Sequence, residues 1–522
     1  MFPPFLPGDC HARRRRARKD SRTRASTLRA DESRIENGLP GAGNPLSVST
    51  NLMSSVDQLR LFLEPASVAV VGANPNSGEQ AFNVVDNLEQ GGYRGQVYPV
   101  NPNYREILGR KCYRTVKEIP GDVDLAIVVT PRGVVPEIIR QCGEKGIRAA
   151  IVVGQGFADA ADGEGKKLQE KVVEVARQSG VRILGPNTIG AANASINFST
   201  AFLKQTDIRK LPVAIVCQSG LFFGTVGRLR VLGKGLDLGN SGDIDVADAL
   251  EYFAQDPEVK VIALHMEGVR DGQRFKEVAR RVTRKKPVVA LKTGRSERSA
   301  KAAQSHTGSL VGKDEVWDAV FKQCGIIRAS DIDEMGDLVR AFSYLPPMKG
   351  RSVGVVTASG GIGIMTMDAC AKYNLDVVEL SPEVKKRLDA MSPLWFKAGN
   401  PLDIWPAIMT CPRPFGETLR AVMTEVLSDP KVNAIVLFAG AWFEGLPPPI
   451  TQVIKETADA FPDKPIAWCP YDGWLFDIHW RDLADRLEQV GRAAAFSIPE
   501  DAVMALSRLA DYYEFVRRDN AV

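Results

Sequence analysis

The sequence has no hydrophobic run long enough to cross a membrane. None of its 522 residues lie in a stretch that approaches the roughly 18 to 20 uncharged apolar residues of a bilayer-spanning helix, and no secretory segment follows the basic residues near the N-terminus. The eight cysteines contain no C-x-x-C pair, which argues against a disulfide scaffold and against a zinc site. We therefore expect a cytoplasmic protein without membrane association and without a structural metal.

Several catalytic motifs are also missing. There is no G-x-x-x-x-G-K-[ST] phosphate loop, no H-E-x-x-H zinc motif and no EF-hand loop. In the first strand-to-turn segment, Gly72-Ala73-Asn74 interrupts the G-x-G-x-x-G pattern of dinucleotide sites, and Ala81 stands where a later glycine would help the helix pack. A P-loop hydrolase is excluded, and a nicotinamide-dependent enzyme is a minor alternative.

The net charge of +4 does not describe the folded part of the chain. Residues 1–30 hold nine Lys or Arg against two Asp, a net +7, so the other 492 residues carry −3 and no nucleic-acid partner is expected. Residues 1–52 contain few large apolar side chains and are predicted to be a disordered tail. The tail is either an organellar transit peptide or an over-extended translation start before Met53, and Pro3, Pro4 and Pro7 favour the second interpretation because they spoil an amphipathic helix.

From Ser67 onward, short β-branched runs alternate with helical stretches, which is typical of parallel sheets wrapped by helices. The pattern predicts an α/β fold with three doubly wound domains, near 53–190, 191–345 and 346–522. Strands are expected at 67–71, 96–100, 124–130, 149–153, 182–184, 212–216, 259–264, 287–291, 352–357, 434–438 and 465–468. Helices are expected near 82–89, 134–145, 165–178, 331–344 and 501–517.

Each predicted domain opens with a strand that runs into small residues and then a helix. These turns are Gly72-Ala73-Asn74, Ser219-Gly220 and Ser359-Gly360-Gly361. Small residues let backbone N–H groups approach a ligand, and the helix N-terminus behind them favours an anion. Any one of them could be an ordinary tight turn of a doubly wound fold, but three in one chain favour phosphate binding.

One of the four histidines stands in a chemically unusual segment. His306 lies within 292–309, a loop of small, polar and basic residues that follows a predicted strand. Imidazole is a competent nucleophile near neutral pH, and basic neighbours can shield a phosphoryl group. Glu267 follows the strand 259–264, and parallel strands deliver both residues to one sheet edge, where the carboxylate could hold the imidazole. The alternatives are a surface histidine without a role and a helix-capping glutamate.

Two other histidines have simpler explanations. His265 directly follows a buried strand and is predicted to be a structural histidine with satisfied hydrogen bonds, although its closeness to Glu267 leaves a minor role open. His479 is interpreted as a partly buried residue at a helix start.

Several segments together resemble a known family. In chain order they are Ser67-Val68-Ala69-Val70-Val71-Gly72-Ala73, Tyr98-Pro99-Val100-Asn101-Pro102, Leu184-Gly185-Pro186-Asn187, Gln218-Ser219-Gly220, Ser305-His306-Thr307-Gly308 and Gly399-Asn400-Pro401-Leu402-Asp403. They resemble the α subunit of NDP-forming acyl-CoA synthetases, particularly ADP-forming acetyl-CoA synthetase, which is related to the succinyl-CoA synthetase α subunit. The resemblance runs from about Leu59 to the C-terminus. It implies a Rossmann-like CoA-binding domain followed by two flavodoxin-like domains.

The resemblance also implies roles for particular residues. His306 would be the phosphorylated histidine, and Glu267 would be the carboxylate that orients it. The helix starts at Ser219-Gly220 and Ser359-Gly360-Gly361 would hold the phosphoryl group between the second and third domains. The implied CoA contacts are Gly72, Ala73, Asn74, Val100, Asn101, Pro102, Thr130, Pro131 and Asn187.

The sequence departs from the family pattern at some of these places. Phe222 and Phe223 replace smaller residues beside the Gln-Ser-Gly segment, which would reshape the pocket for the acyl group. Four smaller departures are Asn74 for a usual Ser, Ala81 for a Gly, Thr188 for a Cys and Cys217 for a Ser.

The implied reaction is acyl-CoA + ADP + phosphate ⇌ carboxylic acid + CoA + ATP, through an acyl phosphate and a phosphohistidine. CoA and a small carboxylic acid or acyl-CoA would bind this chain. ADP or ATP with Mg²⁺ would bind an ATP-grasp domain, for which the three predicted domains leave no room. The resemblance therefore implies a separate ATP-grasp β subunit in a hetero-oligomer, of which α2β2 is one form. Two alternatives are a non-catalytic CoA-binding regulatory subunit and a dinucleotide-dependent enzyme.

Overall fold

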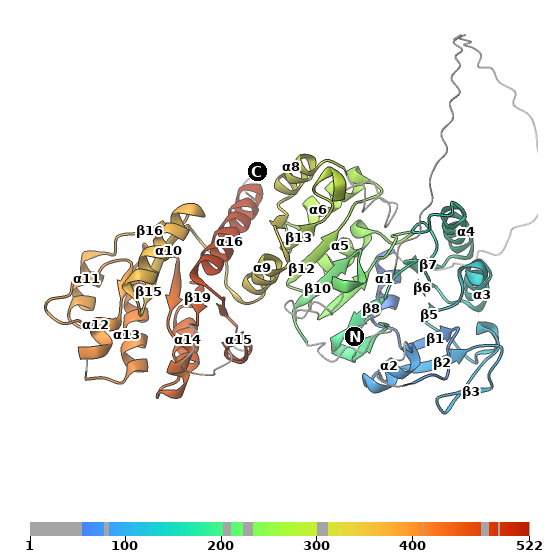
Figure 1. The fold of residues 1–522 in the computed structure, drawn as a ribbon, viewed down its shortest axis with the longest axis horizontal. Coiled ribbons are helices and arrows are strands. Elements are labelled where there is room, and N and C mark those ends of the chain that lie inside the picture. The colour runs from blue at the N-terminus through green and yellow to red at the C-terminus, as the bar shows by residue number, and fades with distance from the viewer. Residues whose placement is uncertain are drawn as a thin grey trace, which may run out of the picture. The chain divides into compact units, whose positions relative to one another are not determined.

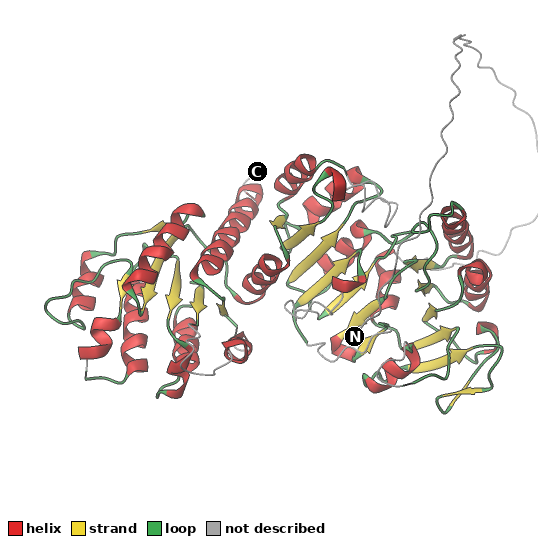
Figure 2. Ribbon diagram, viewed as in Figure 1, coloured by secondary structure: helices red, strands yellow, loops and turns green. Residues whose placement is uncertain are grey.

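The computed structural model describes residues 55–77, 83–201, 210–222, 233–299, 312–410, 412–470, 480–488 and 491–520. The chain divides into two compact units, Met1–Leu52 and Met53–Val522, and every described residue belongs to the second unit. The tail predicted at 1–52 therefore lies outside the described residues. None of the described helices is long and apolar enough to cross a membrane. The described part of the second unit contains three large sheets with flanking helices and one two-stranded hairpin (Figures 1 and 2).

The first sheet has five parallel strands in the order β2-β1-β5-β6-β7. Its three central strands are short and buried at every position, as expected for a parallel sheet covered on both faces. Its elements are β1 (Ser67–Val71), α2 (Val84–Gln90), β2 (Gln96–Val100), the small hairpin β3 (Glu106–Ile107) and β4 (Arg110–Lys111), η1 (Val116–Glu118), β5 (Leu125–Val128), η2 (Arg132–Val134), α3 (Val135–Lys145), β6 (Ala149–Val152), α4 (Glu164–Ser179) and β7 (Arg182–Leu184).

The second sheet has seven strands in the order β14-β13-β12-β10-β11-β8-β9. The prediction of parallel strands is wrong at its β8–β9 edge, where both strands are antiparallel to their neighbours. Only a single short turn joins β8 to β9, whereas a parallel crossover needs a dozen or more residues. The elements are β8 (Ala191–Asn193), η3 (Ala194–Ile196), β9 (Phe198–Ser199), β10 (Val213–Cys217), η4 (Gly220–Phe222), β11 (Lys234–Asp237), α5 (Val246–Gln255), β12 (Val261–Met266), α6 (Gly272–Val282), β13 (Val288–Lys292), α8 (Asp314–Cys324), β14 (Ile327–Ala329) and α9 (Ile332–Tyr344).

Alternate residues of the central strands pack into two different hydrophobic clusters. Val216 and Leu264 belong to a cluster that contains side chains of α5, α6 and α8. Cys217, Ala263 and Leu291 belong to a second cluster, which contains side chains of α9 and α16. Successive strand residues point to opposite faces, so helices cover both faces of this sheet.

The third sheet has six strands, with β16-β15-β18-β19-β20 in order and β17 paired to β15. Its elements are β15 (Ser352–Thr357), α10 (Gly360–Lys372), β16 (Asp376–Val377), α11 (Pro382–Asp389), β17 (Leu402–Asp403), α12 (Trp405–Thr410), α13 (Phe415–Ser428), β18 (Ala434–Phe438), η5 (Ala441–Gly445), α14 (Ile450–Ala460), β19 (Ile466–Cys469), α15 (Trp480–Glu488), β20 (Ala493–Ala495) and α16 (Pro499–Asn520).

Two helices connect neighbouring sheets. The N-terminal helix α1 (Ser55–Leu63) buries Phe62 in the hydrophobic cluster that the first and second sheets share. The last helix, α16, packs against both α9 and α10, and its Tyr512 Oη donates to the carbonyl oxygen of Thr283 at 2.9 Å. Phe342 of α9 and Tyr512 meet edge to face, with their ring centroids 5.4 Å apart. The cores of the three sheets are therefore continuous with one another.

The predicted α/β fold with doubly wound sheets is confirmed. The predicted strands at 67–71, 96–100, 182–184, 352–357 and 434–438 coincide with β1, β2, β7, β15 and β18, and the ends of the other predicted strands differ by at most two residues. The ends of the predicted helices differ by at most three residues.

Candidate active site

The carboxyl ends of β10, β12 and β13 bring polar residues to one edge of the second sheet. Strand β12 lies between β13 and β10, and the register aligns Val216 of β10 with Leu264 of β12. Ser219 and Glu267 each follow three residues later, so both reach the same level of this edge. Thr293, directly after β13, donates its backbone N–H to Met266 O at 3.1 Å. The structure thus brings Glu267 together with the turn at Ser219 and Gly220, as the sequence predicts.

The side chain of Gln218 connects this turn to Glu267. Its Oε1 accepts the backbone N–H of Glu267 at 2.6 Å and that of Gly268 at 3.2 Å. Its Nε2 donates to Ser241 Oγ at 3.3 Å. Gln218 is 4% exposed and Glu267 is 7% exposed, so water has little access to these bonds. The sequence did not predict this contact, because Gln218 stands out only as part of the Gln-Ser-Gly segment and its partners lie about fifty residues later.

His265 is buried beneath the same turn. Its ring stacks on Phe222 of η4, with centroids 3.8 Å apart and planes 8° apart. Its Nε2 shares a hydrogen bond of 3.3 Å with Thr293 Oγ1, but its buried Nδ1 has no partner among the described residues. Within the described residues, the predicted hydrogen bonding of His265 is therefore found at one of its two ring nitrogens. Burial lowers the pKa of His265 to about 3, with a smaller contribution from Lys292, so the imidazole is neutral at physiological pH.

Two departures from the family pattern contact the same buried carboxylate. Thr188 Oγ1 donates to Asp237 Oδ2 at 3.0 Å, and the Cys217 thiol lies 3.7 Å from Asp237 Oδ1. The backbone N–H of Ile189 also donates to Asp237 at 2.8 Å. Burial raises the pKa of Asp237 to about 6, although these hydrogen bonds oppose the rise. Thr188 and Ile189 follow the first sheet, so Asp237 ties that segment to the second sheet.

Lys292 places a buried cation at the end of β13. It is 2% exposed, and its ammonium lies 5.5 Å from the ring centroid of Trp317 in α8 and donates to Thr293 O. Burial lowers the pKa of Lys292 to about 8, a fall that Asp314 opposes. The side chain therefore remains mostly protonated at neutral pH and supplies a positive charge close to this edge of the sheet.

The predicted CoA contacts of the first sheet gather around the turn after β1. Gly72 has a φ of +90°, and a Cβ at this position would lie 2.8 Å from Thr130 Cγ2. The Gly72 N–H donates to Val100 O at 2.8 Å, and Asn101 Nδ2 donates to Ala73 O at 2.8 Å. Thr130 Oγ1 is buried without a hydrogen-bond partner in the described structure. A backbone that can be approached closely, beside an unused hydroxyl, suits a polar ligand such as CoA.

The remaining predicted CoA contacts are less closely grouped. Asn74 Oδ1 accepts the N–H of Asn76 at 2.9 Å, Pro102 follows Asn101 in the turn after β2, and Pro131 caps η2. Asn187 has a φ of +61°, and its Nδ2 donates to Asn240 Oδ1 at 3.2 Å in the turn after β11. The side-chain hydrogen bond of Asn187 therefore joins the first and second sheets and does not involve the Gly72 turn.

The third predicted turn lies at the start of α10. The Ser359 N–H donates to Thr357 Oγ1 at 3.0 Å, and the Ser359 side chain makes no capping hydrogen bond. Gly360 and Gly361 are exposed, and a Cβ at Gly361 would meet no atom within 4 Å. In the described part of the chain, no hydrogen bond joins this turn to Ser219 or Gly220. The helix start is therefore open to an anion.

Some predicted residues lie outside the described residues. These are His306, Phe223, Ala81 and His479. Among the residues that the structure does describe, no group of three His, Cys, Asp or Glu side chains is placed to hold a metal ion.

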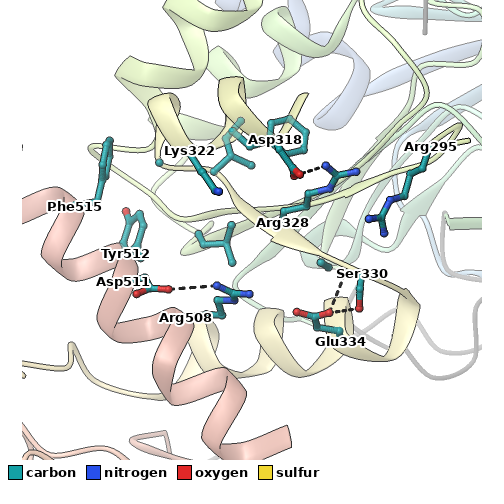
Figure 3. A pocket seen from close by; sticks show the side chains of 15 residues that line it. Arg295, Asp318, Lys322, Arg328, Ser330, Glu334, Arg508, Asp511, Tyr512 and Phe515 are labelled. Atoms are coloured by element: carbon teal, nitrogen blue, oxygen red, sulfur yellow. Dashed lines mark hydrogen bonds and ion pairs between the residues drawn. The ribbon is translucent and has the colours of Figure 1, made fainter. Parts of the chain in front are cut away.

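A pocket of about 570 Å³ lies elsewhere, between α8, β14 and the start of α9 on one side and α16 on the other (Figure 3). Arg295, Lys322 and Arg508 line it, together with Tyr512 and Phe515. Its carboxylates are engaged with neighbours: Asp318 pairs with Arg328, Glu334 with Ser330, and Asp511 with Arg508, as Figure 3 shows. None of the predicted site residues lines this pocket.

Three family models match the chain in succession. They are described as CoA binding domain (residues 66–194), Succinyl-CoA ligase like flavodoxin domain (residues 210–342) and Ligase-CoA domain (residues 353–470). The first model covers the whole first sheet and strand β8 of the second, the second model covers β10 to β14, and the third runs from Val353 in β15 through β19.

Similar proteins fall into two length classes. The chain is 37% identical over 461 residues to Acetate–CoA ligase [ADP-forming] I subunit alpha of Pyrococcus furiosus, covering 86% of this chain and 97% of that protein. It is 38% identical over 352 residues to Acetate–CoA ligase [ADP-forming] of Methanocaldococcus jannaschii, covering 66% of this chain but only 49% of that protein. A solved structure of the dinucleotide-forming acetyl-coenzyme A synthetase 1 of Ca. Korarchaeum cryptofilum, in complex with phosphate and ADP, superposes with a TM-score of 0.78 at 29% identity. That match covers 90% of this chain and 100% of the other.

Proposed function

Since this chain belongs to the family of ADP-forming acyl-CoA synthetases, as an α subunit, we propose that it interconverts acyl-CoA, ADP and phosphate with a carboxylic acid, CoA and ATP. It is then a subunit of an acid–thiol ligase. The observation that carries this proposal is the match to 97% of the length of a separate ligase α subunit, with all three family models in order. A catalytic role is favoured over a purely regulatory CoA-binding role because those relatives are named as ligases.

We propose that residues near 53–190 form the CoA-binding domain, with 191–345 as the domain of the phosphorylated histidine and 346–522 as the third domain. Two features of the first domain fit CoA. At Gly72 a Cβ would crowd the turn, and the Thr130 hydroxyl, which has no hydrogen-bond partner among the described residues, offers a hydrogen bond. Gly72, Ala73, Asn74, Val100, Asn101, Pro102, Thr130 and Pro131 would line the bound CoA, and Asn187 would border it from the junction with the second sheet.

The phosphoryl chemistry would take place at the carboxyl edge of the second sheet. A phosphate oxygen attacks the thioester carbonyl carbon, the C–S bond breaks, and CoA leaves as its thiol with a proton from phosphate. An imidazole nitrogen of His306 then attacks the phosphorus of the acyl phosphate, and the P–O bond to the acyl group breaks to release the carboxylate. Glu267, buried and held by Gln218, would orient His306 through its other ring nitrogen. Backbone N–H groups at Ser219-Gly220 and Ser359-Gly360-Gly361 would hold the phosphoryl oxygens.

We propose that a partner subunit completes the reaction. The chain matches nearly the whole of a separate α subunit but only about half of relatives whose names carry no subunit designation. The missing half would correspond to an ATP-grasp β subunit that binds ADP or ATP with Mg²⁺ in a hetero-oligomer such as α2β2. No metal is then needed on this chain. We also propose a cytoplasmic location, which agrees with the free, buried thiols of the six described cysteines.

Labelling of the histidine tests the proposal. The full chain, incubated with acetyl-CoA and ³²P-phosphate, should acquire an acid-labile, base-stable label on His306, and His306→Ala should acquire none. Glu267→Gln should slow the labelling on the order of 10²-fold, because the imidazole loses its orientation. Label that persists in His306→Ala contradicts the assignment. Tight CoA binding without label, from acetyl-CoA or from ATP plus partner, would identify a regulatory subunit. Thermal stabilisation by NADH and not by CoA would identify a dinucleotide-dependent enzyme.

A further inference from the structure

We infer that Gln218 is a positioning residue for Glu267, fixing the carboxylate that orients His306. The inference rests on the proposed function, since it assigns Gln218 a part in the phosphorylation of His306. Gln218 does not need to touch the reacting atoms for this role. It acts by holding the backbone on which Glu267 stands.

On the β10 side, the side chain of Gln218 hydrogen-bonds to the backbone at Glu267 and Gly268. The paired register of β10 and β12 ends at Val216 and Leu264. Beyond that point, Gln218 Oε1 replaces the backbone carbonyl of a neighbouring strand as acceptor, and it accepts hydrogen bonds from the Glu267 and Gly268 N–H groups. Both N–H groups are buried, so loss of this oxygen would remove an acceptor from each of them where water has little access. The backbone would then move to satisfy them, and Glu267 would move with it.

The other end of the Gln218 amide is fixed as well. Its Nε2 donates to Ser241, a residue held at a φ of +51° in the turn after β11. The neighbouring Asn240 N–H donates to Pro186 O at 2.9 Å, and Asn240 Nδ2 donates to Asp159 at 2.8 Å, both in segments of the first sheet. The amide of Gln218 therefore cannot rotate freely. Its oxygen is aimed at Glu267 by a turn that is itself anchored to the predicted CoA-binding domain.

A matched pair of variants separates positioning from stability. Gln218→Met removes the amide but keeps the length of the side chain. Asn193→Leu is the control: this buried amide also serves two backbone groups, donating to Leu63 O at 3.1 Å and accepting from the Ser195 N–H at 2.9 Å. Asn193 pairs with Lys234 at the start of β11, so it lies at the opposite edge of the same sheet from Glu267.

The readouts are the single-turnover rate of His306 labelling from acetyl-CoA and ³²P-phosphate, and the Kd of acetyl-CoA from calorimetry. Gln218→Met should slow labelling on the order of 10²-fold with an unchanged Kd, because a displacement of about 1 Å costs a reacting group that much. Asn193→Leu should lower the melting temperature and leave the labelling rate unchanged. Gln218→Glu should recover most of the rate, since its carboxylate can still accept both N–H groups.

Two results would overturn the inference: labelling of Gln218→Met at the wild-type rate, or equal slowing in Gln218→Met and Asn193→Leu. If Gln218→Met does not fold, Ser241→Ala replaces it, since that change removes only the bond that aims the amide. A smaller slowing with an unchanged Kd is expected there, and an unchanged rate would contradict the role of Gln218. A wild-type chain that takes no label would instead refute the proposed function, and the inference would fall with it.

Discussion

Replacing Gly72 by alanine should cost the first domain more stability than the same change at Gly109. Both glycines have a positive φ, +90° at Gly72 and +73° at Gly109. They differ in their surroundings: a Cβ at Gly72 would lie 2.8 Å from Thr130 Cγ2 and 3.0 Å from Val129 O, whereas a Cβ at Gly109 would meet nothing within 4 Å. The pair therefore separates the cost of the backbone conformation from the cost of crowding.

The two costs can be estimated. A positive φ costs a non-glycine residue roughly 1–2 kcal/mol, and this applies at both positions. Overpacking of a buried site adds roughly 1–3 kcal/mol, and this applies only at Gly72. Gly72→Ala should therefore lower the free energy of unfolding by roughly 2–5 kcal/mol, and Gly109→Ala by roughly 1–2 kcal/mol. The Gly72 variant should also lose CoA affinity, because its Cβ would keep the ligand away from the turn.

Urea denaturation of the full chain measures the free energy of unfolding, and calorimetric titration measures the affinity for CoA. Unfolding of the first domain is followed by hydrogen exchange at β1 and β5, so that the other domains do not obscure the transition. Equal destabilisation by the two changes would refute the crowding argument. Undiminished CoA binding in a folded Gly72→Ala chain would refute the assignment of CoA to this turn.

Three further changes have distinct expected results. Thr130→Val should leave the stability of the ligand-free chain unchanged, since no described hydrogen bond is lost, but should weaken CoA binding by about tenfold in a calorimetric titration. The pKa of His265 is lowered from 6.5 to about 3, so its contribution to stability is complete above pH 6.5 and is lost as the pH falls. Between pH 7 and pH 5, the free energy of unfolding of the wild type should fall by roughly 2 kcal/mol more than that of His265→Phe, which keeps a ring against Phe222. Parallel pH profiles of the two proteins in urea denaturation would contradict this. Lys234→Met should lower the free energy of unfolding by roughly 3–5 kcal/mol in urea denaturation, because the buried carboxylate of Asp256 loses the ammonium that lies 2.8 Å away. A decrease below about 1 kcal/mol would contradict that account.

The fold could be predicted from the sequence because strands and helices follow from the local pattern of apolar and polar residues. Apolar β-branched runs such as 352–357 and 434–438 are read directly as buried parallel strands, and the structure has strands at these positions. The sequence also predicts that Glu267 lies beside Ser219, because neighbouring parallel strands end at the same edge of a sheet whatever their side chains are.

What the sequence did not predict depends on contacts between residues far apart in the chain. The role of Gln218 lies in two N–H groups about fifty positions later, and nothing in its own segment indicates them. The substitutions Thr188 and Cys217 looked unrelated until both were found against Asp237. The antiparallel strands β8 and β9 are too short to show any periodicity, so their direction is set by the turn between them and by pairing with β11.

The packing of α9 against α16 limits how domains can be recombined between members of this family. A junction near residue 346 looks like a natural place to join the first two domains of one protein to the third domain of another. The hydrophobic cluster that holds Phe342 also holds Tyr512, so such a hybrid would bring together two surfaces that were never selected as a pair. Recombination should succeed only when both helices come from the same parent. Over evolutionary time, α9 and α16 should therefore change together, although some 150 positions separate them.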